Sequence, residues 1–68
     1  MLNDKEVKAL FCDTYNFYLH FKGKSTEQEY WDRALTEYSS LMQKYNGCRM
    51  SCQMLIAVWE QLERENGL

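Results

Sequence analysis

No proline interrupts the chain, and its three glycines, Gly23, Gly47 and Gly67, stand far apart. Each glycine follows a long segment of helical periodicity, as a glycine that ends a helix commonly does. Three long helical segments, each followed by a glycine, predict an all-α fold. The expected helices cover about residues 4–22, 27–45 and 49–65. Because the connections between them are short, neighbouring helices should run antiparallel, which predicts one domain, an up-down-up three-helix bundle over residues 1–68.

Residues suited to helix capping precede the first two expected helices. The Asn3 side chain can accept a hydrogen bond from a free amide of the first turn, and Glu6, three residues on, can reach back to the Asn3 amide. Either Ser25 or Thr26 can cap the second helix in the same way. These caps place the helix starts close to residues 4 and 27.

Apolar side chains recur three and four residues apart in the first two expected helices, so each helix should bury one stripe. The stripe of the first helix comprises Val7, Leu10, Phe11, Thr14, Phe17, Tyr18 and Phe21. The stripe of the second comprises Tyr30, Trp31, Ala34, Leu35, Tyr38, Leu41, Met42 and Tyr45. Together the two stripes predict most of the core.

Two further apolar rows exceed what a single stripe needs. Apolar residues cover roughly 200° of the circumference of the third expected helix, about twice what a surface helix requires. One side of that helix carries Cys52, Ile56 and Trp59. The outer side of the first helix carries Cys12, Tyr15 and Leu19. Either both rows pack inside a tight monomer whose third helix is central, or they are contact surfaces for another protein.

The small size of the chain favours the contact interpretation. A domain of 68 residues gains only ~3–5 kcal/mol from one hydrophobic core, so it commonly needs a staple, a metal or a partner. Aromatic residues make up 15% of the chain, and aromatic side chains are enriched at binding hot spots. We therefore expect a non-catalytic protein-interaction module that binds another protein or a second copy of itself, for example as a homodimer completing the bundle.

The charge pattern offers no attraction to nucleic acid or to an anionic membrane. Eight basic and ten acidic residues leave a net charge of −2, and the two signs are interspersed. The longest uncharged apolar stretch, residues 54–59, is far too short to span a bilayer. The N-terminus lacks the pattern of a signal peptide, and an odd number of cysteines is typical of reduced thiols. These features predict a cytoplasmic protein that does not enter a membrane.

Neither catalysis nor a cofactor is indicated. His20 is the only histidine, and no Gly-rich phosphate loop is present. A small domain made only of helices also offers no obvious cleft for a substrate. The sequence therefore predicts that the protein is not an enzyme and holds no cofactor.

A zinc-stapled domain is a weaker alternative. Sulfur and imidazole ligands of the type that zinc prefers are supplied by Cys12, His20, Cys48 and Cys52. The usual two-residue gap between paired ligands is missing, and Cys12 and His20 point to different sides of their expected helix. Small apolar thiols and a surface imidazole are the commoner interpretation.

A helix-turn-helix DNA-binding regulator is the main alternative function. The second and third expected helices flank Asn46-Gly47, and Arg49 stands where a recognition helix would begin. Basic residues at the helix ends can form one patch only if those ends meet: Lys22, Lys24, Lys44 and Arg49. Because the third helix is apolar where base-reading polar residues should lie, nucleic acid is the less favoured partner.

The chain resembles small uncharacterised all-helical proteins of Gram-positive phages and integrative elements. The likeness lies in residues 31–46, which open on Trp31-Asp32 and close on Lys44-Tyr45-Asn46, and in the AVWEQLE run of residues 57–63. Such proteins are often accessory factors that bind and inhibit or redirect a host protein, including proteins of bacterial defence. The resemblance implies an interaction protein of the bacterial cytoplasm, without a specific target or functional residue.

Overall fold

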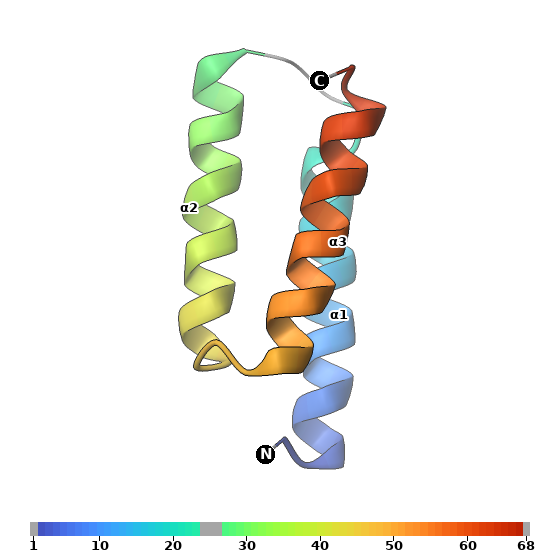
Figure 1. Ribbon diagram of the computed structural model, residues 1–68, viewed down its shortest axis with the longest axis vertical. Helices are drawn as coiled ribbons and strands as arrows, with labels where there is room; N and C mark the ends of the chain where they lie inside the picture. Colours follow the sequence, from blue (N-terminus) through green and yellow to red (C-terminus); the bar gives the residue numbers. More distant parts are fainter. Residues whose placement is uncertain (1, 24–26, 68) are drawn as a thin grey trace.

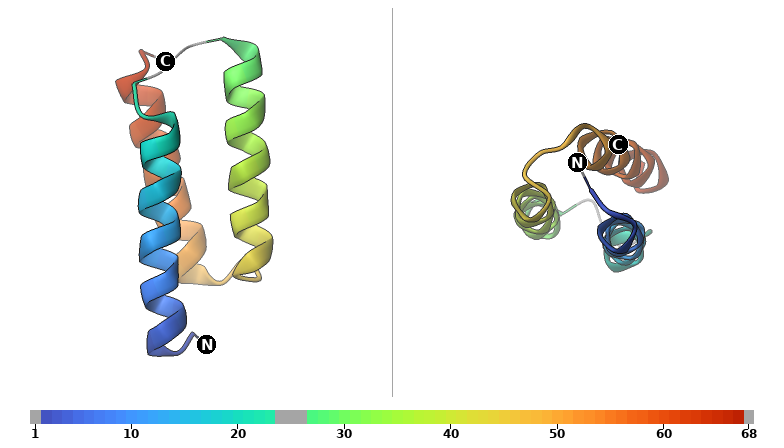
Figure 2. Two further views of the ribbon diagram at one scale, coloured as in Figure 1. Left: turned by 180° about the vertical axis from the view of Figure 1, so that it is seen from behind. Right: turned by 90° about the horizontal axis from the view of Figure 1, so that it is seen from below.

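The computed structural model describes residues 2–23 and 27–67, and within these residues it contains three helices and no strand. The helices are α1 (Asp4–Phe21), α2 (Gln28–Lys44) and α3 (Arg49–Glu65). α1 and α3 run in the same direction and α2 runs against both, as Figure 1 shows. Seen end-on, the three axes form the corners of a triangle (Figure 2). The predicted three-helix bundle is confirmed, with helix bounds within one residue of those expected.

Local capping fixes the start of α1 as the sequence predicts. The Asn3 side-chain oxygen accepts a hydrogen bond of 2.8 Å from the Glu6 amide. In return the Glu6 carboxylate accepts one of 3.2 Å from the Asn3 amide. The proposed caps of α2, Ser25 and Thr26, lie outside the described residues, and the residue immediately before α2 is Glu27.

A left-handed backbone turn ends α2 and allows the chain to enter α3. Asn46 and Gly47 adopt φ values of +55° and +60°. The Gly47 amide donates a hydrogen bond of 2.9 Å to the Met42 carbonyl, which satisfies an acceptor that the helix end leaves free. Two successive positive φ values explain why the sequence has Asn-Gly at this point.

The core combines a cluster of aromatic rings around Phe17 with buried aliphatic side chains from all three helices. Phe17 is fully buried and packs its ring against those of Phe21, Tyr38 and Trp59, with ring centroids 5.5, 6.3 and 6.5 Å away. Buried aliphatic side chains extend this cluster along all three helices: Leu10, Ala34, Leu55 and Leu62. Aromatic pairs at these separations each add about 0.5–1.5 kcal/mol beyond the burial of area.

Two residues that the sequence assigns to the buried stripes are exposed. Phe11 has 54% of its surface exposed and Leu35 has 53%. Each lies ~100° around its helix from a fully buried neighbour, Leu10 or Ala34, because successive residues of an α-helix are separated by that angle. The two neighbouring helices cover a narrower arc than the apolar stripe occupies, so the stripe's edge reaches solvent.

Polar contacts fasten α1 to both other helices. On the α2 side, the Asp13 carboxylate accepts hydrogen bonds from Lys44 and Tyr45, and His20 lies 3.0 Å from Glu37. On the α3 side, the Tyr18 hydroxyl donates a hydrogen bond of 2.7 Å to the Glu65 carboxylate. These contacts fix the rotation of α1 about its own axis.

The last carbonyl of α1 joins the three helices at one end of the bundle. The Phe21 carbonyl accepts a hydrogen bond from the Tyr30 hydroxyl of α2. It also accepts one of 3.4 Å from the side-chain amide of Asn66, which follows α3. A helix C-terminus that would otherwise expose a free acceptor is thereby satisfied from both neighbours.

The seam between α2 and α3 differs from the contacts of α1, because it contains apolar contacts in place of polar ones. The Trp59 ring of α3 contacts Trp31 and Tyr38 of α2, each with ring centroids 5.3 Å apart. Lower in the seam, the Cys52 sulfur lies 3.8 Å from the Met42 sulfur. Between residues 28–44 and 49–65 no ion pair and no nitrogen–oxygen hydrogen bond crosses this seam. The seam is therefore held by apolar packing.

Candidate protein-binding surfaces

A shallow apolar groove runs along the α2–α3 seam. It is lined by Leu35 and Tyr38 from α2 and by Ile56, Trp59 and Glu60 from α3. In each helix the two apolar lining residues are three positions apart, which places them on one face. We call this surface the α2/α3 groove.

The α2/α3 groove has a firm floor and exposed walls. Tyr38 and Trp59 form the floor, because their rings pack edge to face at 66° and both also contact the buried ring of Phe17. Leu35 and Ile56 form the walls, with 53% and 46% of their surfaces exposed. A rigid floor with exposed aliphatic walls gives a partner a fixed surface to pack against.

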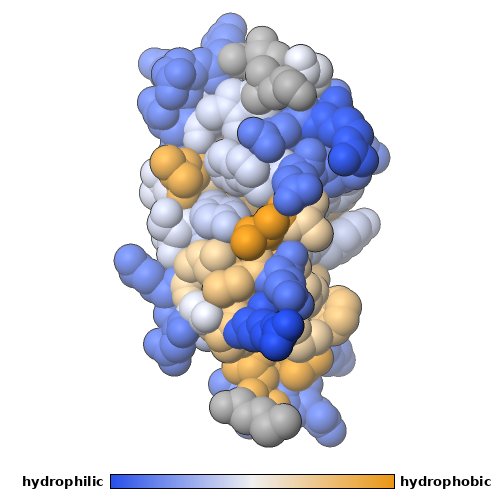
Figure 3. Space-filling model, in the orientation of Figure 1, coloured by the Kyte–Doolittle hydropathy of each residue, from blue (hydrophilic) through white to orange (hydrophobic). Residues whose placement is uncertain are grey.

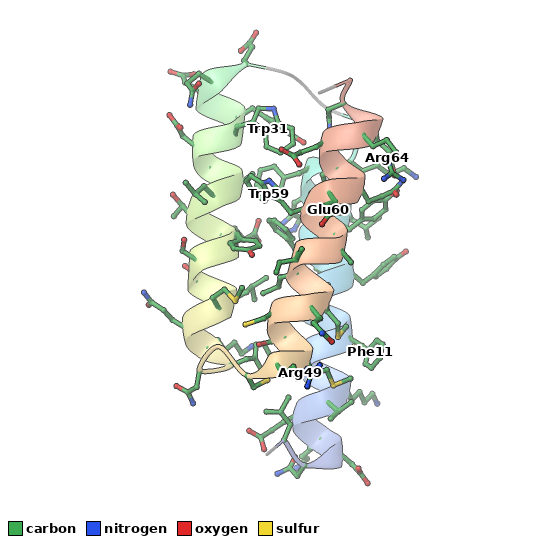
Figure 4. All side chains as sticks on the ribbon, viewed as in Figure 1. Phe11, Trp31, Arg49, Trp59, Glu60 and Arg64 are labelled. Atoms are coloured by element: carbon green, nitrogen blue, oxygen red, sulfur yellow. The ribbon has the colours of Figure 1, made fainter. Side chains whose placement is uncertain are left out.

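Trp31 and Trp59 point toward one another between the two helices in Figure 4. The Trp31 indole nitrogen is buried, and it has no hydrogen-bond acceptor among residues 2–23 and 27–67. Because that nitrogen is buried, a partner cannot reach it from solvent. Trp31 therefore supports the groove through its ring, which contacts Trp59 and Tyr30.

One end of the α2/α3 groove is acidic. Glu60 lines the groove, and Glu63 lies one helical turn beyond it on α3. Asp32 lies one turn before Leu35 on α2, close to the same end. We call Asp32, Glu60 and Glu63 the acidic end. Arg49, at the start of α3, lies near the opposite end of that helix in Figure 4, and it lines a different hollow with Leu2 and Val7.

The outer side of α1 carries a second apolar surface. Three exposed side chains four positions apart form a single row, which we call the α1 ridge: Phe11 (54% exposed), Tyr15 (61%) and Leu19 (42%). The ridge faces away from α2, as the labelled Phe11 shows in Figure 4. Lys8 precedes the row by three positions and Lys22 follows it by three, so a positive charge stands at each end.

The space-filling view relates these surfaces to the polar exterior. On the face drawn in Figure 3, hydrophobic residues gather over the centre and the lower half, and hydrophilic residues cover much of the upper right. The exposed large apolar side chains of the described chain belong mainly to the groove and the ridge, and Met50 is a further one at 38% exposure. Met50 belongs to a third apolar hollow near the start of α3, which is lined by Leu2, Val7, Cys48, Arg49 and Met50.

The row expected on the outer side of α1 is exposed throughout. Cys12, Tyr15 and Leu19 all reach solvent. Phe11 belongs with Tyr15 and Leu19 more closely than Cys12 does, because those three are four positions apart along one line. The spacing of these three residues is visible in the sequence, but Phe11 also fits the buried stripe that the sequence predicts for this helix.

The structure divides the row expected on α3. Ile56 is exposed, whereas Cys52 and Trp59 are half-buried against α2. The Cys52 thiol lies 3.2 Å from the Gly47 carbonyl, so it faces the turn between the helices. The other groove residues, Leu35 and Tyr38, come from α2 and were predicted as core. The binding role that the sequence predicts for Ile56 and Trp59 stays a prediction, and the sequence predicts no such role for Leu35 or Tyr38.

The four possible zinc ligands are dispersed. His20 pairs with Glu37 near the end of α1, Cys12 is exposed on the same helix, and Cys48 precedes α3. Hydrogen bonding to Ser51 lowers the pKa of the Cys48 thiol. In the part of the chain that the structure describes, no three His, Cys, Asp or Glu residues are arranged to hold a metal ion.

The basic residues considered for DNA binding occupy opposite ends of the bundle. Lys22 follows α1, whereas Lys44 ends α2 and Arg49 begins α3, at the other end. Lys44 is also paired with Asp13 at 2.7 Å. Lys24 lies outside the described residues. Lys22, Lys44 and Arg49 therefore form no single basic surface.

Comparisons with known proteins add no identification. The chain matches no protein-family model, and comparison with curated proteins and with solved structures gives no match. Among residues 2–23 and 27–67, none of the helices combines the length and the hydropathy that crossing a membrane requires.

Proposed function

We propose that this protein is a non-catalytic protein-binding module whose α2/α3 groove accepts an amphipathic helix of a partner protein. One observation carries the proposal: Leu35 and Ile56 stand exposed on either side of a floor formed by Tyr38 and Trp59. Amphipathic helices bind such grooves through apolar side chains three and four positions apart. A fourth helix in this position converts the three-helix arrangement toward a four-helix bundle.

The chemistry of the groove suits modest, reversible binding. Full burial of a Leu or Ile side chain is worth about 1.5–3 kcal/mol, and each of these walls is already about half buried. Tyr and Trp in the floor belong to the residue types that anchor interfaces. A single helix also buries less area than a standard stable interface, so affinity rests on these few side chains.

The proposed action is occlusion or scaffolding. A helix held in the groove is withdrawn from its other contacts, which is how a small protein without catalytic groups inhibits or redirects a larger one. The resemblance of residues 31–46 and 57–63 to accessory proteins of phages and integrative elements supports a bacterial host protein as the partner. That setting, in the cytoplasm, is part of the proposal.

Methyl NMR of the labelled protein tests whether the groove binds helices. The probe is a synthetic helical peptide with leucines four positions apart and lysines at both ends. We expect saturable shifts of the Leu35 and Ile56 methyl signals. The groove variant, Leu35→Glu with Ile56→Glu, should bind at least about tenfold more weakly, because two apolar contacts become charged.

A control variant places the same two charges elsewhere. Ser40→Glu with Gln43→Glu changes exposed positions of α2 that line neither surface. It should bind the peptide as the wild type does, with unchanged helix content by circular dichroism. Equal loss in the control and groove variants, or the absence of methyl shifts in the wild type, contradicts groove binding.

A further inference from the structure

We infer that the α2/α3 groove is built to accept the α1 ridge of a second copy of this chain, so that molecules associate head to tail. The inference rests on the proposed function and specifies the partner of the same groove. Its basis is that one chain exposes two unlike apolar surfaces, a row on one helix and a hollow between two others. Each has the form that the other requires.

The shapes of the two surfaces correspond. Phe11, Tyr15 and Leu19 repeat every four residues, and rows with this spacing are the ridges that pack into grooves between side chains of neighbouring helices. At 1.5 Å per residue the row extends about 12 Å along α1. The groove offers Leu35 and Ile56 as opposing walls on two helices, so an incoming ridge contacts both.

The lysines at the ends of the ridge are opposite in charge to the acidic end of the groove. Lys8 and Lys22 stand at the two ends of the ridge, whereas the groove has its acidic end at Asp32, Glu60 and Glu63. In either direction of the incoming helix, one lysine reaches the acidic end.

The placement of the surfaces determines the kind of assembly. The groove faces outward between α2 and α3, and the ridge lies on the side of α1 away from α2. A contact between unlike surfaces is heterologous, so each bound copy keeps one free ridge or one free groove. Such contacts produce open chains, or rings where the rotation between copies closes.

Sedimentation equilibrium of the intact chain, from micromolar to millimolar concentrations, tests the inference. We expect the average mass of the wild type to rise with concentration beyond that of a dimer. The ridge variant, Tyr15→Glu with Leu19→Glu, and the groove variant should each associate at least about tenfold more weakly. The Ser40→Glu, Gln43→Glu control should associate as the wild type does, and circular dichroism verifies that every variant keeps its helices.

Mixing the ridge variant with the groove variant provides the decisive test. The ridge variant retains an intact groove and the groove variant retains an intact ridge, so an equimolar mixture should form a 1:1 dimer and nothing larger. Self-association of the ridge variant at the wild-type level overturns the inference, because it indicates contact between two grooves. A mixture that stays monomeric overturns it as well.

The outcome separates this inference from the proposed function. A wild type that is monomeric at every concentration overturns association between copies. If the same protein still shows saturable Leu35 and Ile56 methyl shifts with the helical peptide, the groove binds helices of another protein. If those shifts are also missing, both proposals are overturned.

Discussion

The phenol of Tyr45, in the turn after α2, donates a hydrogen bond of 2.6 Å to the Asp13 carboxylate of α1. The same carboxylate oxygen accepts one of 2.7 Å from Lys44. Tyr45 is only 5% exposed, so this hydrogen bond lies at the edge of the core rather than on the open surface. Hydrogen bonds to a charged acceptor are stronger than those between neutral groups.

Loss of the Tyr45 hydroxyl should destabilise the fold. We expect Tyr45→Phe to lower the free energy of unfolding by about 1–2 kcal/mol, since a bond to a partly buried carboxylate is lost while the ring remains. Urea denaturation measures the change. Tyr15→Phe is the matched control, because Tyr15 is 61% exposed, and it should leave the transition unmoved.

The same contact should make stability depend on pH at both extremes. Burial raises the pKa of Asp13, but hydrogen bonds from Lys44 and Tyr45 outweigh that effect and hold it below the usual 3.8. Asp13 therefore contributes stability above pH 3.8, and the contribution disappears as pH falls through its lowered pKa. In Asp13→Asn, the urea midpoint should fall less steeply on acidification than in the wild type.

The contribution of Tyr45 to stability changes with pH in the opposite direction, because it is lost as the pH rises. Burial, and then the hydrogen bond to Asp13, raise the pKa of Tyr45 from 10.0 to about 12. The Tyr45 contribution is complete below pH 10 and disappears as pH rises toward 12. Over this pH interval, the urea midpoint of Tyr45→Phe should therefore fall less than that of the wild type. Parallel curves for the two proteins would contradict the assignment.

Two phenylalanines of α1 should respond very differently to truncation. Phe17 is fully buried and Phe11 is 54% exposed. Phe17→Ala should lower the free energy of unfolding by about 3–5 kcal/mol, which is comparable to the whole stability of a domain this small. Phe11→Ala should lower it by less than about 1 kcal/mol. Thermal unfolding followed by circular dichroism distinguishes the two, and similar losses would refute the orientation of α1.

The turn between α2 and α3 should require a residue that tolerates positive φ. A β-carbon on Gly47 would meet no atom within 4 Å, so the only obstacle to alanine is the φ of +60°. We expect Gly47→Ala to destabilise the protein by about 1 kcal/mol. Gly67→Ala, at φ +80° beyond the last helix, should have a smaller effect because chain ends fray. D-alanine at position 47 should restore the stability in a synthetic chain.

Local features of this fold are predictable from sequence. The capping pair of Asn3 and Glu6 and the left-handed turn at Gly47 depend only on residues a few positions apart. Helix bounds follow from such features. The buried positions of Thr14 and Tyr45 are also predictable, because both lie near the centre of their predicted stripes. A residue near the centre of a buried stripe stays buried even when the helix rotates slightly about its axis.

Features that depend on helix rotation were not predictable. Phe11 and Leu35 lie at the edges of their stripes, where the position of the neighbouring helix decides between core and solvent. The bond between Tyr45 and Asp13 joins residues 32 positions apart, and no local pattern announces it. The α2/α3 groove is not apparent from the sequence for the same reason: two of its five lining residues come from α2, and the sequence predicts both as core.

The hydrogen bond between Tyr18 and Glu65 joins the first helix to the last across 47 positions of sequence. The α1–α2 and α2–α3 pairs are each separated by only a few residues of sequence and form from nearby contacts, whereas α1 and α3 meet only after a long loop has closed. We therefore expect Tyr18→Phe to accelerate unfolding and to leave the folding rate nearly unchanged in stopped-flow experiments. How long a molecule stays folded would then depend on the contact between its outermost helices, and how quickly it folds on the contacts between helices that are adjacent in sequence.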